Sequence, residues 1–261
     1  MRRSETTVAP AAREQRNGIQ VISRAAAILR ALERDPDGLS LGEIAKEVAL
    51  PRSTVQRIVD ALDRENLVLA SSTPKGVRLG PAILRLASAT RFVIRDLARQ
   101  TMEALSKETG ETVDLAIFDQ DKVVFVDQVR GTQRLTTVSS VGASFPLHCS
   151  ANGKAVLAAL EGPVFTRLKK RLTLPRQTRN TIVSWPALER ELEQIRAAGV
   201  AYDREENSVG ISTVSVALRS PTGELAAIAV PVPAQRFAAN EASLARALRQ
   251  ACEALQRELG R

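Results

Sequence analysis

The spacing of apolar residues in the first third of the chain predicts three short helices followed by a β-hairpin. Apolar stripes at helical spacing run over about residues 21–33, 41–48 and 55–62. Ser40 and Glu43 have the spacing of a capping box, which places the start of the second helix directly after Ser40. Pro51 suits the first turn of the third helix, where its missing N–H would have no partner. Two short apolar segments, 67–70 and 77–79, flank a turn with proline and glycine and predict the hairpin.

From about residue 81 onward, helical and strand-like patterns follow one another. Helical patterns cover about 82–89, 93–109, 151–160, 186–198 and 241–258. Strand-like patterns cover about 112–118, 122–128, 214–218 and 225–232. This interleaving predicts an α/β (α+β) domain in the second part of the chain, large enough for a core of its own.

A change in composition marks the boundary between the two parts. All eight aromatic residues lie at Phe92 or later, and Gly80 ends the helix–hairpin module. We therefore expect a boundary between these two residues. The expected organisation is a disordered tail at 1–17, a first domain at 18–80, a linker helix at 81–95 and a second domain at 96–261.

Composition limits the class of protein. The 261 residues carry 37 Lys and Arg against 29 Asp and Glu, and this net charge of +8 favours a polyanionic partner, nucleic acid before a membrane surface. No apolar run approaches the ~20 residues that span a bilayer, and the charged N-terminus lacks the apolar core of a signal peptide. Two cysteines and one histidine cannot supply a disulfide framework or a zinc site. We expect a cytoplasmic protein with no metal and no other cofactor.

Two helices joined by a tight turn and followed by a hairpin predict a winged helix-turn-helix, with the helix-turn-helix at about 40–60. The outer face of its third helix would present Arg52, Ser53, Thr54, Gln56 and Arg57. These side-chain types contact phosphates and base edges, and Lys75 and Arg78 in the hairpin could reach the flanking DNA backbone or the minor groove. Because the module has no aromatic side chain for unstacked bases, duplex DNA is favoured. The alternative is an ordinary helical pair with a solvated polar face.

Several segments resemble the IclR family of bacterial transcriptional regulators. They are GIQVISRAAAILRAL, LPRSTVQRI, GASFPLHCSANGKAVLAAL, GVAYDREENSVGIS and AIAVPVP, in the right order over about residues 18–255. The resemblance implies a winged-helix dimer or tetramer whose linker helices lead to a C-terminal effector domain with a GAF-like sheet. It also implies palindromic promoter sites and a small-molecule effector, often an organic or aromatic acid. Neither the effector's identity nor repression as against activation follows from it.

The resemblance also implies an effector pocket. Its expected residues are Val138, Gly142, Ala143, His148, Cys149, Ser150, Ala151, Asn152, Asp203, Thr213, Ala229 and Pro231. The backbone amides that begin the helix at residue 151 would be a natural seat for a carboxylate. Thr213 stands where many members have cysteine, and Ala229 and Pro231 stand where many have serine. We therefore expect a less polar pocket than in those members, suited to an effector bulkier or more apolar than a two- or three-carbon acid.

An alternative from another class is a hydrolase that uses Cys149 or Ser150 and carries an accessory winged helix. The single histidine, His148, stands next to Cys149, and neighbours on an extended segment point to opposite faces, so they make a poor nucleophile–base pair. A basic run at 167–179 could touch DNA outside the operator core, although a solvated face is the more ordinary interpretation.

Overall fold

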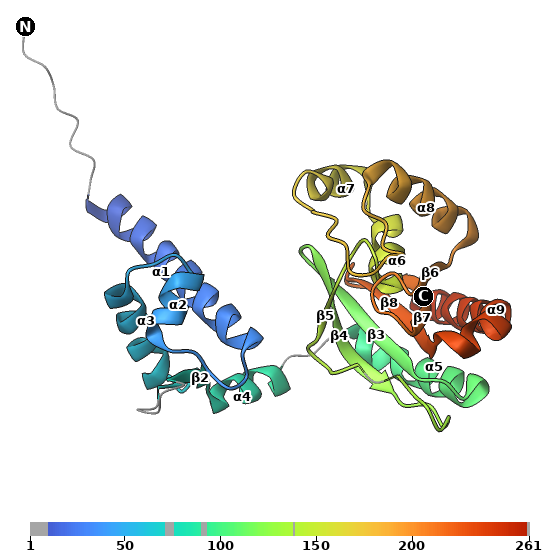
Figure 1. Cartoon of the computed structure of the whole chain (residues 1–261), viewed down its shortest axis with the longest axis horizontal. Helices are drawn as coiled ribbons and strands as arrows, with labels where there is room; N and C mark the ends of the chain where they lie inside the picture. The colour runs from blue at the N-terminus through green and yellow to red at the C-terminus, as the bar shows by residue number, and fades with distance from the viewer. Residues whose placement is uncertain (1–9, 71–75, 90–92, 138, 260–261) are drawn as a thin grey trace, which may run out of the picture. The chain divides into compact units, whose positions relative to one another are not determined.

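The computed structural model describes residues 10–70, 76–89, 93–137 and 139–259 (Figure 1). The chain divides into two compact units, Met1–Arg91 and Phe92–Arg261. Among the described residues, no helix combines the length and the apolar character needed to cross a membrane.

The first unit contains the predicted helices and hairpin. Its elements are α1 (Pro10–Arg34), α2 (Leu41–Glu47), α3 (Arg52–Arg64), β1 (Val68–Ala70), β2 (Val77–Leu79) and α4 (Pro81–Ala89). Side chains from α1, α2, α3 and the hairpin form one apolar core, which includes Ile28, Ile44 and Val59. The capping box is confirmed: the Glu43 amide donates to Ser40 Oγ, and the Ser40 amide donates to Glu43 Oε2.

The turn between α2 and α3 has a special backbone geometry. Ala49 is exposed and has φ of +52°, in the left-handed region that favours glycine. Pro51 precedes the helix as its N-cap, one position before the expected first turn. Asn66, with φ of +56°, stops α3 as predicted. Leu39 and Val77 exchange backbone hydrogen bonds, so the segment before α2 is tied to the hairpin.

The predicted tail is wrong for residues 10–17, which lie in α1; residues 1–9 lie outside the described part of the chain. Residues 11–16 read AAREQR, a run of good helix formers that lacks an apolar stripe. Hydrophobic periodicity therefore misses it. Of the expected linker helix at 81–95, residues 81–89 lie in α4 and residues 93–95 begin α5, while residues 90–92 lie outside the described part of the chain.

The second unit is a six-stranded antiparallel sheet between two layers of helices (Figure 1). Its helices are α5 (Val93–Thr109), α6 (Ala151–Ala159), α7 (Gly162–Lys169), α8 (Trp185–Ala198) and α9 (Ala234–Leu259). Its strands are β3 (Val113–Asp119), β4 (Lys122–Val129), β5 (Ser144–Pro146), β6 (Ala201–Arg204), β7 (Ile211–Arg219) and β8 (Leu225–Pro233). The strand order is β5-β4-β3-β8-β7-β6.

Alternate residues of the central strands serve two cores. Leu115 and Ile228 pack against α5 and α9, whereas Ala116 and Ala227 pack against α6 and α8. On the second face, Trp185 meets the ring of Phe165 edge-on. Both faces are therefore covered, as the near-continuous apolar run of β8 requires.

Three elements were not expected from the sequence: β5, β6 and α7. The strands are three and four residues long, too short to show an alternation. Helix α7 begins at a Gly-Pro pair that reads as a breaker, although proline is favoured at a helix start. Helix α9 begins at Ala234 rather than at about residue 241.

Candidate DNA-binding face and ligand pocket

Helix α3 presents the polar face that its apolar stripe predicts. Val55, Ile58 and Val59 are buried. Arg52, Ser53, Gln56 and Arg57 are exposed, and Thr54 is half-buried. Within the described residues, Arg52 and Arg57 form no ion pair, so both guanidinium groups are available to a polyanion.

Gln56 is held on its own helix. Its Nε2 donates to Asp60 Oδ1 over 2.6 Å, one turn further along α3. In the hairpin, Arg78 on β2 is exposed. Lys75, the other predicted contact in the hairpin, lies outside the described residues.

The second unit encloses a pocket between the sheet and the start of α6. Its cavity volume is about 140 Å³. The apolar part of its wall includes Phe125 and Phe145, whose rings meet edge-on with centroids 4.8 Å apart. Its polar part includes Asp114 and Asp203. A cavity of about 150 Å³ can hold one benzene ring, so this pocket has room for a single ring.

Half of the expected pocket residues line this cavity. They are Ser150, Ala151, Asn152, Asp203, Thr213 and Pro231. Five of the others are placed elsewhere: Gly142 and Ala143 in the turn before β5, His148 and Cys149 buried in the loop before α6, and Ala229 on β8 paired with Asp114 of β3. Val138 lies outside the described residues.

The sequence reasoning missed the remaining lining residues. They are Asp114, Phe125, Thr137, Ser139, Phe145, Asn207, Ser208 and Ile211. Asp114 carries a signal that could have found it, because it is an acid flanked by apolar residues within the strand VDLAIFD, whereas Asp119 stands at the strand end. The two phenylalanines give no such signal, since an aromatic residue on a strand is ordinarily part of a core.

The expectation of a less polar pocket rests on the β7 and β8 positions, and the cavity wall as a whole combines apolar and polar side chains. Thr213 and Pro231 do line it, but two carboxyl groups line it as well. These two carboxyl groups come from β3 and β6. A comparison of the β7 and β8 positions alone could not show this.

Helix α6 begins at the pocket and is held by close packing. Ser150 caps it, accepting from the Gly153 amide while its hydroxyl donates to the Pro146 carbonyl. A β-carbon at Gly153 would lie 2.4 Å from Leu147 Cα, so only glycine allows the loop to cross the helix here. The amides of Ala151 and Asn152 in the first turn have no partner within the helix. They place a partial positive charge at the cavity.

Two aspartates in the pocket are poorly solvated. Burial raises the pKa of Asp114 to about 6, against the hydrogen bonds that it accepts from Gln128 and Ser139. Burial also raises the pKa of Asp203 to about 7, against the backbone amides of Glu206 and Asn207, which donate to its Oδ1. Both groups therefore change charge close to neutral pH.

Behind the pocket lies a buried ionic cluster. Lys154 of α6 is 0% exposed, and its Nζ lies 2.6 Å from Glu206 Oε1 and 2.9 Å from Glu191 Oε1. Burial raises the pKa of Glu206, and Lys154 opposes that rise. The Glu206 carbonyl accepts from the hydroxyls of Thr178 and Thr181. The lysine thus joins α6, α8 and the turn after β6.

The geometry does not support a hydrolase. His148 Nε2 is 2.9 Å from the Pro175 carbonyl oxygen, and the Cys149 thiol donates to Asn207 Oδ1 rather than to the imidazole. Burial raises the pKa of Cys149 to about 12, so the thiolate is disfavoured. The Ser150 hydroxyl is engaged in capping α6. No nucleophile–base pair forms among these described residues.

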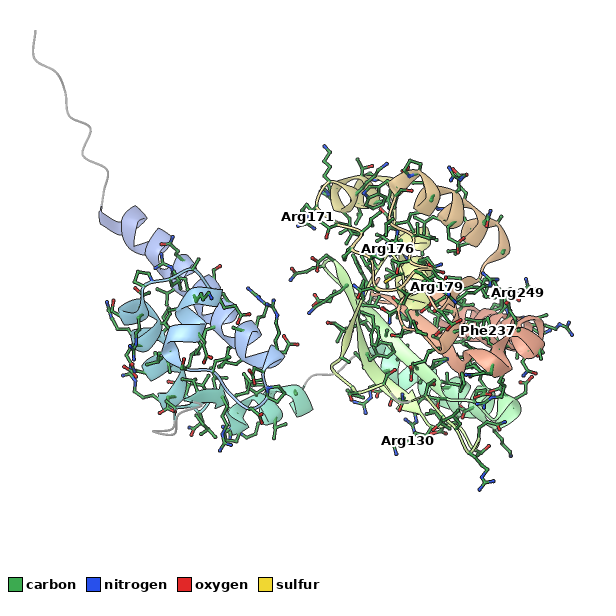
Figure 2. All side chains as sticks on the ribbon, in the orientation of Figure 1. Arg130, Arg171, Arg176, Arg179, Phe237 and Arg249 are labelled. Carbon is green, nitrogen blue, oxygen red and sulfur yellow. The ribbon has the colours of Figure 1, made fainter. Side chains whose placement is uncertain are left out.

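The basic run at 167–179 spans the end of α7 and the segment before α8 (Figure 2). Arg167, Lys170 and Arg171 are exposed beside a second, shallow cavity. Lys169 instead pairs with Glu189, and Arg176 donates to the carbonyls of Thr178 and Arg179. Part of the run is therefore structural.

A winged helix with an unpaired basic outer face, on one chain with a sheet unit that encloses a small pocket, defines a DNA-binding transcriptional regulator. Comparison with known proteins gives its family. Residues 21–70 match the IclR helix-turn-helix domain, and residues 86–257 match the C-terminal domain of the bacterial transcriptional regulator IclR. The chain belongs to the IclR family.

Three similar proteins illustrate the relationship. The HTH-type transcriptional regulator Rv1719 of Mycobacterium tuberculosis is 50% identical over 231 residues, covering 88% of this chain and 89% of its own. The regulator TtgV of Pseudomonas putida is 37% identical, covering 94% and 93%. An IclR homologue from Microbacterium hydrocarbonoxydans, solved with 4-hydroxybenzoate, has the same fold at 23% identity, with a TM-score of 0.73 over 92% of this chain and 98% of its own. Both sequence relatives are named transcriptional regulators, and the hydrolase alternative is wrong.

Proposed function

We propose that the protein binds a palindromic promoter site in duplex DNA through α3 and changes its DNA affinity when a small organic molecule enters the pocket beside α6. The observation that carries the DNA-binding half is the exposed, unpaired pair Arg52 and Arg57 on a helix whose other face is buried. The observation that carries the effector half is the enclosed cavity at the start of α6.

The α3 contacts divide into two kinds. Arg52 and Gln56 are the side chains that read base edges, because arginine pairs with guanine and glutamine with adenine in the major groove. Ser53, Thr54, Arg57 and, in the hairpin, Lys75 and Arg78 position the protein on phosphates. Two copies of the chain read the two half-sites, with recognition helices about 34 Å apart, one turn of DNA.

The effector is a small organic molecule with one ring. Phe125, Phe145 and Pro231 supply the apolar wall, and the amides of α6 supply donors. An organic or aromatic acid, the class that the family resemblance implies, would place its carboxylate at those amides. The two aspartates oppose that charge. An effector can act only if it binds one arrangement of the dimer better than the other.

The direct test is fluorescence anisotropy with the duplex upstream of the protein's own gene and with a scrambled duplex, at two salt concentrations. Arg52→Ala should weaken binding to the genuine duplex by roughly 1–3 kcal/mol and relax preference at one base position. Arg64→Ala is the matched control, because Arg64 is also an exposed arginine of α3 but lies in its last turn. It should leave affinity unchanged.

Equal losses on both duplexes would reassign Arg52 to phosphate contacts. Wild-type binding that shows neither a steep salt dependence nor any effect of Arg52→Ala would refute the proposed interface. Sedimentation of the complex with a two-half-site duplex measures how many chains bind each site.

A further inference from the structure

The charges that line the pocket are of one sign. Asp114 and Asp203 line it, and none of its described lining residues is basic. The nearest buried cation, Lys154, is engaged by Glu206 and Glu191. A ligand therefore meets two carboxyl groups and only the partial positive charge of the α6 amides.

One carboxylate oxygen of Asp203 is free to accept a hydrogen bond. Its Oδ1 accepts from the amides of Glu206 and Asn207, while no described group donates to its Oδ2. The side chain is 4% exposed and lines the cavity. A bound molecule that donates a hydrogen bond could therefore reach this oxygen from the cavity.

Asn152 supplies an independent sign of a missing partner. It lines the same cavity and is 3% exposed, yet its Nδ2 has no hydrogen-bond partner among the described residues. With the amides of the first turn of α6, it offers donors that need an acceptor. A buried polar group without a hydrogen-bond partner costs free energy. A ligand that both accepts a hydrogen bond from Asn152 and donates one to Asp203 should therefore bind most tightly.

A hydroxyl group accepts and donates at once, whereas a carboxylate only accepts and an ammonium only donates. Resting on the proposed effector role of this pocket, we propose that its ligand is an uncharged, single-ring aromatic hydroxy compound, a phenol, and that the pocket discriminates against the matching carboxylate. The edge-on pair of Phe125 and Phe145 packs on the ring, and the volume of about 140 Å³ limits the ligand to one ring.

The test is calorimetric titration of the full-length protein with 4-methylphenol, 4-methylbenzoate and toluene. The wild type should bind 4-methylphenol at least tenfold more tightly than either of the others. Asp203→Asn removes the negative charge but keeps an oxygen for the two backbone amides. It should weaken 4-methylphenol and strengthen 4-methylbenzoate, so that the preference falls several-fold or reverses. Asp121→Asn, an exposed aspartate in the β3–β4 turn, is the matched control and should behave as the wild type.

A second measurement needs no variant. Asp203 is faced by Glu206, Lys154 and Cys149, and Asp114 by Gln128 and Ser139. Burial raises the pKa of both aspartates into the range from about 6 to about 7, so both lose negative charge as pH falls from 8 to 6. The affinity for 4-methylbenzoate should rise several-fold over that interval, while that for 4-methylphenol should not.

The outcomes separate the two proposals. Tighter wild-type binding of 4-methylbenzoate, or a pH-independent affinity for it, overturns the ligand class and leaves the effector pocket intact. Binding of none of the three probes overturns the ligand class as well. Binding of probes with no change in operator affinity, measured by anisotropy, overturns the effector role itself.

Discussion

Replacing Lys154 with methionine tests the electrostatic account of the second unit. Lys154 is fully buried, and the Glu206 side chain that it neutralises is 9% exposed. Methionine has nearly the same length and is apolar, so the substitution removes the charge and leaves little cavity. It leaves the Glu206 carboxylate without its Lys154 partner, and the second oxygen of that carboxylate already lacks a hydrogen-bond partner among the described residues.

The loss in free energy of unfolding caused by Lys154→Met has an upper bound, because Glu206 can take up a proton and become neutral. Breaking a buried pair by removing one partner costs about 3–5 kcal/mol. Neutralising a carboxyl with the ordinary pKa of 4.5 at pH 7 costs about 3.4 kcal/mol, at about 1.36 kcal/mol for each pH unit. The expected loss in free energy of unfolding is therefore about 3 kcal/mol at pH 7.

The pH dependence has a definite sign. Without Lys154, the pKa of the buried Glu206 rises further, so the folded variant holds a proton that the unfolded chain releases. Stability then falls as pH rises. The loss relative to the wild type should be about 2 kcal/mol at pH 6 and near 5 kcal/mol at pH 8, if the carboxyl stays protonated when folded.

The assay is urea unfolding followed by the fluorescence of Trp185, the single tryptophan of the chain. Lys169→Met is the matched control, because Lys169 also lies 2.6 Å from a glutamate but is 37% exposed. That control also loses the contact of Lys169 with the Trp185 ring, so a loss of about 1 kcal/mol without a pH slope is expected. A loss below 1 kcal/mol for Lys154→Met at pH 8, or equal losses at pH 6 and pH 8, would refute the reasoning.

Three further predictions follow from backbone and thiol geometry. Gly153→Ala should cost about 3 kcal/mol in urea unfolding because its methyl group meets backbone atoms, while Gly162→Ala, which faces open space, should stay within about 1 kcal/mol; equal effects would contradict this. Ala49→Gly should raise the melting temperature slightly, by relief of a left-handed alanine worth about 1–2 kcal/mol, less the entropy cost of glycine; a lower melting temperature would count against that strain. Cys149 and Cys252, whose burial raises the pKa of each thiol to about 12, should resist iodoacetamide in the folded protein; rapid alkylation at pH 8, detected by mass spectrometry, would show that either is accessible.

The first unit was predictable because local signals determine it. The capping box at Ser40, the stop at Asn66 and the apolar stripe of α3 each act within a few residues, and each is found in the structure. The exposed face of α3 follows from that stripe by geometry alone.

The pocket was half predictable, for a physical reason. Ser150, Asn152 and Asp203 came from matching motifs, whereas the Asp114 wall depends on the pairing of β3 with β8, which no local pattern reveals. Hydrogen bonds to the 203–206 turn depend in the same way on long-range packing. For that reason the sequence implies an acid as the ligand, whereas the two carboxyl groups of the pocket lead us to propose an uncharged one.

The hydrogen bond between Gln56 and Asp60 bears on how this protein divides affinity from specificity. In the free protein the Gln56 amide points along the helix to Asp60, so reading a base exchanges one hydrogen bond for another. Such an exchange is nearly neutral in free energy when the base offers a good partner. When the base offers no good partner, the Gln56 amide keeps its hydrogen bond to Asp60 and adds no binding free energy. At the proposed interface Gln56 would therefore add specificity and little affinity, whereas the unpaired Arg57 would supply attraction to the phosphates of any DNA sequence.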